Sequence, residues 1–449
     1  MKNLTLLASA LFASLSSASM LSPDIQESSL VVYNGGIGLV HEKRSLTLNK
    51  NDTNIIYEDV ANTIDTDSVN IKLTDSIKLY SQQYRFDKLT QQKLLNAHID
   101  KKVEVRVLKD VKNFKIITAT LLSSSANKSI VKTSNSKIIT VDSNNIIFDT
   151  IPKELITKPS LVWNVQTDKR IKTDIEIDYL IKNISWKSNY ILNVSKNIAN
   201  LSGWISVDNR SGKKFIKTDL NLLAGDINMA REERLYQDVR YAKMAMASAP
   251  VQHKAHEGYH IYKIPFKIDL ANNEKTQIKF IDKRSIDIKR TFVSNLSNPL
   301  YLQNQTKHDV TQYINIKGLD FALPKGVVRT YSKINKQSIL LGQSSLKHTP
   351  KNSPIELKLG TNFDLKVTQS ILSRDDSKYQ YSASVEYSVK NSSDEQKTVK
   401  LLIPFNKNKN SKVKTSAAFS YTEGNKIEFL VEVNANSTAS LKASFISKK

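Results

Sequence analysis

The chain has 449 residues, which at roughly 100–200 residues per domain predicts two to four domains, and its hydrophobic fraction of 40% excludes wholesale disorder. It contains no Cys, which excludes disulfides, cysteine nucleophiles and thiolate metal sites. The formal net charge is +23, but it comes mainly from Lys and is not in one block: it is −1 over residues 20–110, +8 over 111–225 and +15 beyond residue 225. Because nucleic-acid recognition favours the bidentate Arg side chain, this charge indicates a Lys-rich solvated surface rather than a nucleic-acid partner.

The first nineteen residues have the pattern of a secretory signal peptide. Lys2 precedes an apolar stretch over residues 4–15, and small residues follow at 16–19. The apolar stretch is shorter than the ~20 residues that span a bilayer. We therefore expect cleavage near Ala18 or Ser19 and a mature protein in the periplasm, at the cell surface or secreted, without a transmembrane segment.

Alternation of apolar and polar residues dominates the rest of the chain and predicts a mainly β fold. Near the N-terminus it indicates a β-hairpin over residues 30–40, followed by one short helix within 87–98. About five short strands between residues 103 and 148 suggest a small SH3-like barrel. Further strands are expected at 161–165, 171–180, 186–194, 204–208, 220–223 and from 259 onward. These later strands predict Ig-like β-sandwich domains.

The pattern divides the chain into six segments. Residues 229–249 are rich in Ala, Met, Arg and Glu and lack a period of two, so they indicate a helical or mobile linker. The expected segments are a signal peptide (1–19), an N-terminal β domain with a short helix (20–100), a small β-barrel (101–150), a first β-sandwich part (151–228), the linker (229–257) and a C-terminal β-sandwich part (258–449).

One sequence motif could carry chemistry. His256-Glu257-x-x-His260 has the spacing of zinc proteases, in which a helix brings both imidazoles to one zinc ion and the Glu activates a water. Here Gly258 lies inside the motif and His260 begins a strand-like run, so a helix is not expected. Three interpretations stay open: a catalytic zinc site, loop binding of a metal by His253, His256 and His260, and a solvated loop that leads into a strand.

Several sequence blocks follow one another in a familiar order. They are residues 180–190, 201–204 (with Gly203 and Trp204), 209–212, 223–226, 323–329, 341–342, 348–350 and 360–364. In this order they resemble a bacterial exported domain-of-unknown-function family that also forms the C-terminal half of mucoidy-inhibitor-like proteins, in its short form. The resemblance implies an exported, β-rich envelope protein without established catalytic residues. Trp186 and Trp204 are expected to anchor the core.

The sequence therefore predicts an exported cell-envelope β protein that works by binding or scaffolding, with no cofactor. Its expected partners are envelope proteins or anionic envelope polymers such as polysaccharide. Two alternatives remain: a zinc-dependent hydrolase that uses His256, Glu257 and His260, and a surface adhesin that binds host protein through Lys side chains.

Overall fold

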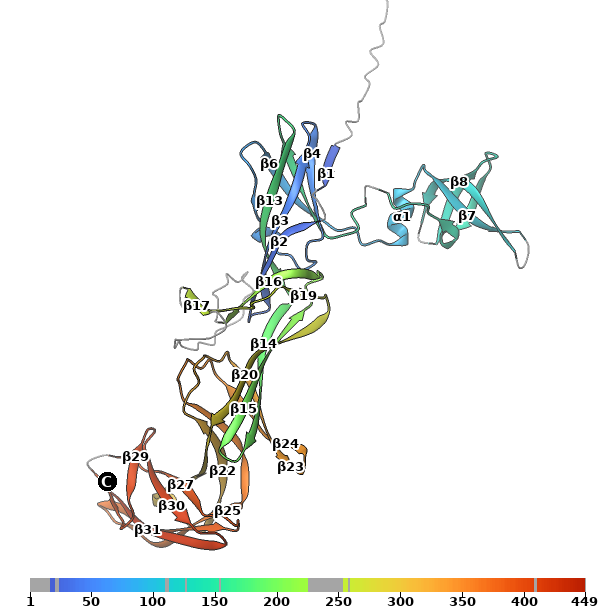
Figure 1. The fold of residues 1–449 in the computed structure, drawn as a ribbon. Coiled ribbons are helices and arrows are strands. Elements are labelled where there is room, and N and C mark those ends of the chain that lie inside the picture. The colour runs from blue at the N-terminus through green and yellow to red at the C-terminus, as the bar shows by residue number, and fades with distance from the viewer. Residues whose placement is uncertain are drawn as a thin grey trace, which may run out of the picture.

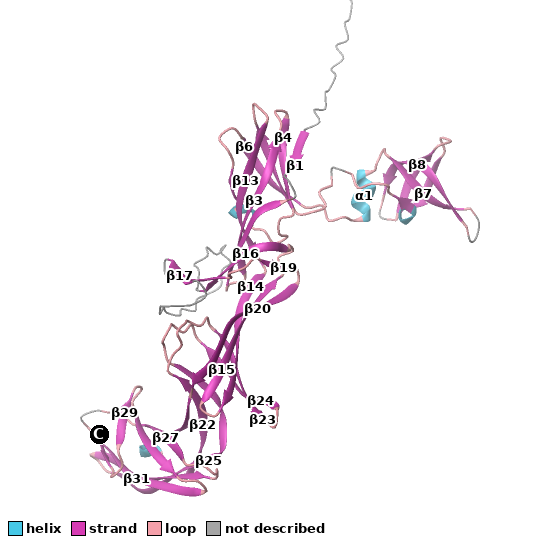
Figure 2. Ribbon diagram, in the orientation of Figure 1, coloured by secondary structure: helices cyan, strands magenta, loops and turns pink. Residues whose placement is uncertain are grey.

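The protein is described by a computed structural model that covers residues 17–20, 24–109, 113–125, 127–152, 155–224, 253–256, 259–407 and 410–448, with the backbone alone for 17–20, 253–256 and 259–260. Strands dominate it, as predicted, and α1 (Gln91–Ala97) is the one α-helix of the described residues (Figure 2). The units follow one another in an elongated body, and a small sheet projects from one side (Figure 1). No helix in the described part of the chain is long and apolar enough to cross a membrane.

Two sheets form the upper unit. The first has the order β1 (Ser17–Met20), β4 (Asp52–Glu58), β12 (Ser160–Gln166) and β6 (Lys78–Arg85). The second has the order β17 (His253–His256), β18 (Tyr259–Lys263), β16 (Phe215–Ala224), β2 (Ile25–Tyr33), β3 (Ile37–Leu48), β13 (Ile171–Lys182) and β5 (Asn70–Lys72), and β19 (Ile268–Leu270) also pairs with β16. The ranges 20–100 and 151–228 thus share one core, in which Trp163 and Trp186 are buried.

The small sheet contains β10 (Ile138–Asp142), β9 (Lys128–Thr133), β8 (Phe114–Ser124), β7 (Lys102–Leu108) and β11 (Ile146–Ile147), in that order. The number of strands matches the prediction for residues 103–148, but the prediction that they close into a barrel was wrong. No pairing joins the edge strands β10 and β11 among the described residues, so the sheet stays open. Its core lies on one face and includes Leu95 of α1.

The middle sheet has the order β20 (Glu274–Asp287), β15 (Ile198–Asn209), β14 (Ile184–Ser195), β23 (Gly326–Ile334) and β24 (Gln337–Leu346). The C-terminal sheet has the order β28 (Ser411–Lys414), β31 (Ser437–Lys448), β26 (Gln380–Asn391), β25 (Ile355–Asp376), β22 (Thr306–Ile316), β21 (Lys289–Asn295), β27 (Lys397–Pro404), β30 (Lys426–Val433) and β29 (Phe419–Thr422). Three single-turn 3₁₀ helices, η1 (Thr66–Ser68), η2 (Ser143–Asn145) and η3 (Pro299–Tyr301), complete the described elements. Trp204 of β15 is only half-buried, so it does not anchor a core as expected.

Most of two predicted segments, the signal peptide and the linker, lies outside the described residues. Residues 1–16 of the signal peptide lie there, whereas the expected cleavage site lies in β1, which pairs with β4 in parallel. Of the linker at 229–257, residues 229–252 and 257 lie outside the description. Its remaining residues form the strand β17, because they pair with β18 in a hairpin.

The two halves of the chain share a turn that the sequence pattern did not reveal. Asn209, at the end of β15, donates from Nδ2 to the carbonyls of Lys213, Leu270 and Ala271, at 2.8, 3.3 and 3.2 Å. Asn391, at the end of β26, donates to the carbonyls of Glu395, Val433 and Asn434 at 2.8, 3.3 and 3.0 Å. In both turns the Asn Oδ1 accepts from the backbone and side chain of the Ser two residues later. In each half, the Asn side chain therefore joins its own turn to one neighbouring segment through three backbone carbonyls.

A cluster of charged side chains lies buried in the upper core. Glu42 is fully buried on β3, and Arg44 donates from Nη2 to Glu42 Oε2 at 2.7 Å. The Nζ of buried Lys213 lies 3.1 Å from Glu42 Oε1, a close ion pair that lacks hydrogen-bond geometry. Tyr57 on β4 donates its hydroxyl to Glu42 Oε2, and Lys213 also donates to the backbone carbonyl of Asp59. The cluster connects β3, β4 and the turn that follows β15.

Candidate binding groove

Three hollows follow one stretch of chain, residues 280–292 in β20 and β21. Their volumes are about 220, 1070 and 770 Å³. The first and second share Lys283 and Asp320, and the second and third share residues 287–289. We call this series of adjoining hollows the β20 groove. It lies where the middle sheet passes into the C-terminal sheet, and such junctions between units are common ligand sites.

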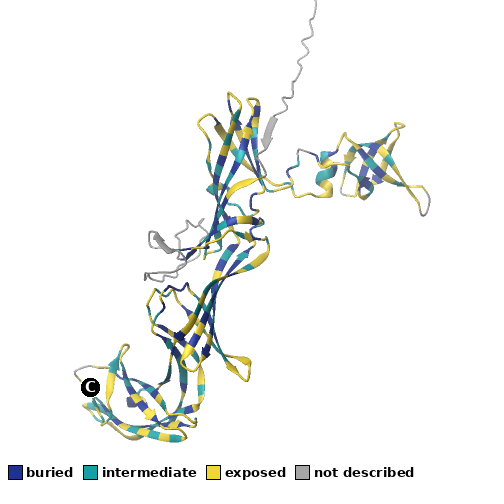
Figure 3. Cartoon of the chain, in the orientation of Figure 1, coloured by how far each residue is buried: buried dark blue, intermediate teal, exposed yellow. Residues whose placement is uncertain are grey.

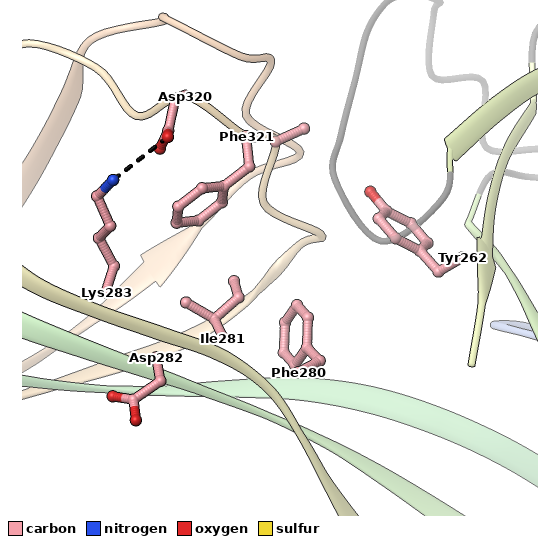
Figure 4. A pocket seen from close by; sticks show the side chains of 8 residues that line it. Tyr262, Phe280, Ile281, Asp282, Lys283, Asp320 and Phe321 are labelled. Atoms are coloured by element: carbon pink, nitrogen blue, oxygen red, sulfur yellow. Dashed lines mark hydrogen bonds and ion pairs between the residues drawn. The ribbon is translucent and has the colours of Figure 1, made fainter. Parts of the chain in front are cut away.

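The first hollow is an apolar pocket (Figure 4). Phe280 and Ile281 of β20 line one side, Phe321 and Ala322 of the segment after β22 line another, and Tyr262 of β18 lies at one end. Tyr262 belongs to the core of the upper unit and Phe321 to the core beside the middle sheet, while Phe280 packs against both cores. The pocket is smaller than the ~300–1000 Å³ typical of whole-ligand sites, so its size suits a single apolar side chain.

A glycine makes room for the aromatic side of this pocket. Gly203 of β15 pairs with Ile281, and a Cβ at position 203 would lie 2.9 Å from Cε1 of Phe280. Real Cβ atoms are essentially never this close to a neighbour, so any larger residue would displace the Phe280 ring. Gly203 thus acts on the pocket through Phe280.

The pocket carries charge only at its rim. Lys283 Nζ lies 3.2 Å from Asp320 Oδ2, and both side chains are substantially exposed. A second pair, Lys279 with Asp282 at 2.8 Å, flanks it on the same strand. Burial raises the pKa of Tyr262 well above its usual range, so its hydroxyl stays protonated at neutral pH. The charged residues that line the pocket are therefore one cation, Lys283, and two anions, Asp282 and Asp320.

The larger hollows are lined by side chains of both charges, three of each sign in the second and four cations with three acids in the third. Lys283, Lys289 and Lys317 line the second hollow together with three acids, Asp287, Asp320 and Glu356. In the third, two of the lysines are paired with carboxylates, Lys397 with Glu395 at 2.5 Å and Lys400 with Glu428 at 2.9 Å. Surface pairs of this kind contribute little to stability, so a ligand can exchange them at low cost.

The backbone of β20 adds a second kind of binding group. Among the described residues β20 pairs with β15 on one side only, so it is an edge strand of the middle sheet. An edge strand presents alternate N–H and C=O groups along its free side. Gly203 pairs with Ile281 and Trp204 with Lys279, so Phe280 lies at a β-bulge, and residues 280–283 of this edge strand all line the pocket.

The histidines of the sequence motif lie in a hairpin instead of a helix. His253 pairs with Tyr262, Ala255 with His260, and His256 with Tyr259. Because paired residues share a face and successive residues alternate, this register places positions 256 and 260 on opposite faces of the hairpin. Glu257 lies outside the described residues. The one-face helical geometry of a zinc protease is thus not formed here.

Two further observations bear on the chemistry. In the part of the chain that the structure describes, no group of three or more His, Asp or Glu side chains could hold a metal ion. His348 accepts a hydrogen bond from the backbone N–H of Lys325 at 3.2 Å, which helps to hold the segment beside β23.

No protein-family model matches the chain, and no curated protein matches it either.

Sequence reasoning did not find the residues of the groove. Phe280, Lys283 and Asp320 come from segments that meet only after folding, and none belongs to a recognisable motif. A signal was nevertheless present in residues 274–287, where Lys and Asp recur within an otherwise strand-like run. Charges of this kind are typical of an exposed edge strand.

Proposed function

We propose that this protein is an exported cell-envelope protein that binds an extended segment of another envelope protein in the β20 groove. The predicted signal peptide supports export, and the resemblance to the exported mucoidy-inhibitor-like family supports the envelope. The segment would add to the free edge of β20 through main-chain hydrogen bonds and insert one apolar side chain into the pocket of Phe280 and Phe321. Affinity from the backbone combined with specificity from a side-chain pocket is the usual logic of β-strand addition.

The observation that carries this proposal is the coincidence of pocket and edge. The same residues, 280–283, line the apolar pocket and belong to the edge strand. A ligand that only filled the pocket would not need the edge, whereas an extended peptide uses both. The continuation of the groove to residue 292 provides length for such a segment.

The charge of the groove favours a polypeptide over an anionic polymer. The second hollow is lined by three Lys and three acidic side chains, so it offers no net positive potential. A polysaccharide with repeated negative charges would meet Asp287, Asp320 and Glu356 along with the lysines. A peptide of mixed charge can match such a pattern side chain by side chain. We therefore choose the envelope-protein partner from the two that the sequence suggested.

The proposal is tested by capture and then by a defined peptide. The mature chain is immobilised and exposed to the envelope fraction of its native host, and the proteins retained by the wild type but not by Ala322→Phe are identified by mass spectrometry. Proteolysis of the bound partner then identifies the protected segment, which is synthesised. We expect this peptide to bind the wild-type chain, and Ala322→Phe to weaken binding at least about tenfold because the new ring fills the pocket.

Matched variants separate the groove from general electrostatics. Lys283→Glu, which reverses one charge of the Lys283–Asp320 pair, should weaken peptide binding, whereas Lys390→Glu, at an exposed position of β26, should not. Equal capture by wild type and Ala322→Phe would contradict the proposal. Retention of polysaccharide alone, released by salt, would support the anionic-polymer alternative instead.

A further inference from the structure

A second surface lies on the small sheet, far from the β20 groove in Figure 1. Its outward face carries five exposed apolar side chains, which together we call the outer apolar face. They are Leu108, Phe114, Ile116, Ile130 and Ile138, and their exposed fractions run from 40% to 67%.

The register shows that these residues share one face. Leu108 pairs with Phe114 across β7 and β8, and Ile138 pairs with Lys132 across β10 and β9. Ile116 pairs with Arg106, and Ile130 lies two residues from Lys132 on the same strand. Thr120, four residues after Ile116 on β8, pairs with Lys132 and so joins the two pairs of strands. Because paired residues share a face and neighbours alternate, the five side chains project from the same side of the sheet.

The small sheet does not need this face for its own stability. The opposite face already carries a core of Val103, Val105, Ala119, Leu121, Val131, Val141 and Leu95. Exposed and buried residues alternate along β7 and β9, as Figure 3 also shows for the unit as a whole. A sheet with a full core on one face and large apolar side chains on the other is atypical, since antiparallel sheets usually turn polar residues to solvent. Clustered exposed apolar side chains mark an interaction site.

Basic side chains are interleaved with the apolar ones. The register puts Lys102, Arg106, Lys128 and Lys132 on the same face, and the guanidinium of Arg106 lies 5.8 Å from the ring centre of Phe114. Two acids share the face, Glu104 and Asp142, of which Asp142 is paired with Lys128 at 2.6 Å. Residues 101–150 as a whole contain nine Lys and Arg against four Asp and Glu. The surface is thus both apolar and positively charged.

We infer that the outer apolar face binds the surface of a membrane rich in anionic lipids. Aliphatic and Phe side chains enter the boundary between headgroups and acyl chains, while Lys and Arg contact the anionic headgroups. Single-stranded nucleic acid fits less well, because it is bound by stacking on several aromatic rings and this face has one, Phe114. The inference is independent of the β20 groove: one surface would hold the protein on a bilayer while the other holds a protein segment.

Vesicle binding tests the inference directly. The full mature chain is mixed with vesicles of phosphatidylcholine, with or without phosphatidylglycerol, and the bound fraction is measured by co-sedimentation. We expect binding that requires phosphatidylglycerol. The double variant Leu108→Thr with Ile116→Thr should weaken it at least about tenfold. Arg106→Gln and Lys132→Gln should each weaken it roughly fivefold at low salt.

A matched control is available on other strands. Ile216 and Ile334 are 52% and 55% exposed but lie outside the small sheet, so Ile216→Thr with Ile334→Thr should leave vesicle binding unchanged. As a readout that does not depend on loss of binding, Phe114→Trp should give tryptophan emission that shifts to the blue when anionic vesicles are added. The inference is overturned if vesicles do not bind, if the control weakens binding as much as the test variant, or if the face binds a single-stranded oligonucleotide but no vesicle.

Discussion

Replacement of Glu42 by Gln probes the buried charge cluster most severely. Glu42 is the anion shared by two buried cations, Arg44 at 2.7 Å and Lys213 at 3.1 Å, and it accepts the hydroxyl hydrogen of Tyr57. When Glu42 loses its charge, Arg44 retains its hydrogen bond to the Glu58 carbonyl at 3.0 Å, and Lys213 retains its ion pair with Asp59. Removal of one partner of a buried pair costs about 3–5 kcal/mol, because the other charge stays buried and uncompensated. We expect Glu42→Gln to lose at least this much unfolding free energy.

Replacement of Lys213 by Met should cost less, and the two changes should not be additive. After Lys213→Met, Glu42 still pairs with Arg44, so the buried anion keeps one cation, and the Met side chain retains the packing of the Lys stem. In the double variant only Arg44 is left without a charged partner in the cluster. We therefore expect the double variant to be more stable than the sum of the single effects predicts, by about 1–3 kcal/mol.

The assay is urea unfolding followed by tryptophan fluorescence. Trp163 and Trp186 lie in the same core as Glu42, and the Trp163 ring is 5.6 Å from that of Tyr57, so their emission reports on this unit. A loss below about 1 kcal/mol for Glu42→Gln, or strict additivity in the cycle, would refute the reasoning that the cluster is a coupled buried network.

The remaining predictions concern pH, the shared turns, the pocket and the histidine motif. Burial tends to raise the pKa of Glu42, but Lys213, Arg44 and the bonds from Tyr57 and Arg44 outweigh it and hold the pKa below its usual 4.5. The stabilisation by ionised Glu42 is therefore complete above pH ~4.5, and it is lost as the pH falls through the lower pKa of Glu42 in the folded protein. The difference in unfolding free energy between wild type and Glu42→Gln should thus narrow only in acid. Asn209→Ala and Asn391→Ala each remove side-chain hydrogen bonds from several backbone groups, and each should cost about 2–4 kcal/mol by chemical denaturation; a loss in one turn alone would contradict their equivalence. Gly203→Ala should destabilise the chain and weaken peptide binding, while Gly35→Ala, with no atom within 4 Å of the added Cβ, should do neither in a thermal scan. His256→Ala should leave the zinc content of purified protein unchanged, as measured by elemental analysis, and a stoichiometric zinc lost in this variant would restore the hydrolase hypothesis.

Local alternation predicted the strands well but not how they pair. Residues 171–179 read as a strand with one buried face, and β13 buries Ile175, Ile177 and Tyr179 as that pattern requires. The partner of each strand depends on the path of the whole chain: β2 lies beside β16, where Leu30 pairs with Leu220. For this reason residues 20–100 looked like a domain of their own although their strands complete sheets made by later segments.

The buried charges show a signal that could have been used. Residues 41–44 read as a solvated run, His-Glu-Lys-Arg, but alternation with Val40, Leu46 and Leu48 places Glu42 and Arg44 on the buried face of β3. The charges within residues 274–287 indicate only an edge strand. They do not predict the groove, because its two sides, residues 280–289 and 315–322, come together only through the sheet topology. The open small sheet was missed for a related reason, since strand count does not determine closure.

Hydrogen exchange along β20 tests the proposed function most directly. The mature chain is labelled in deuterated buffer with and without the peptide identified by capture, and exchange is followed by mass spectrometry. Strand addition predicts slower exchange of backbone amides within residues 280–287 when the peptide is bound, and no such change in Ala322→Phe. Peptide binding without protection of β20, or protection confined to another edge strand such as β24, would contradict the account.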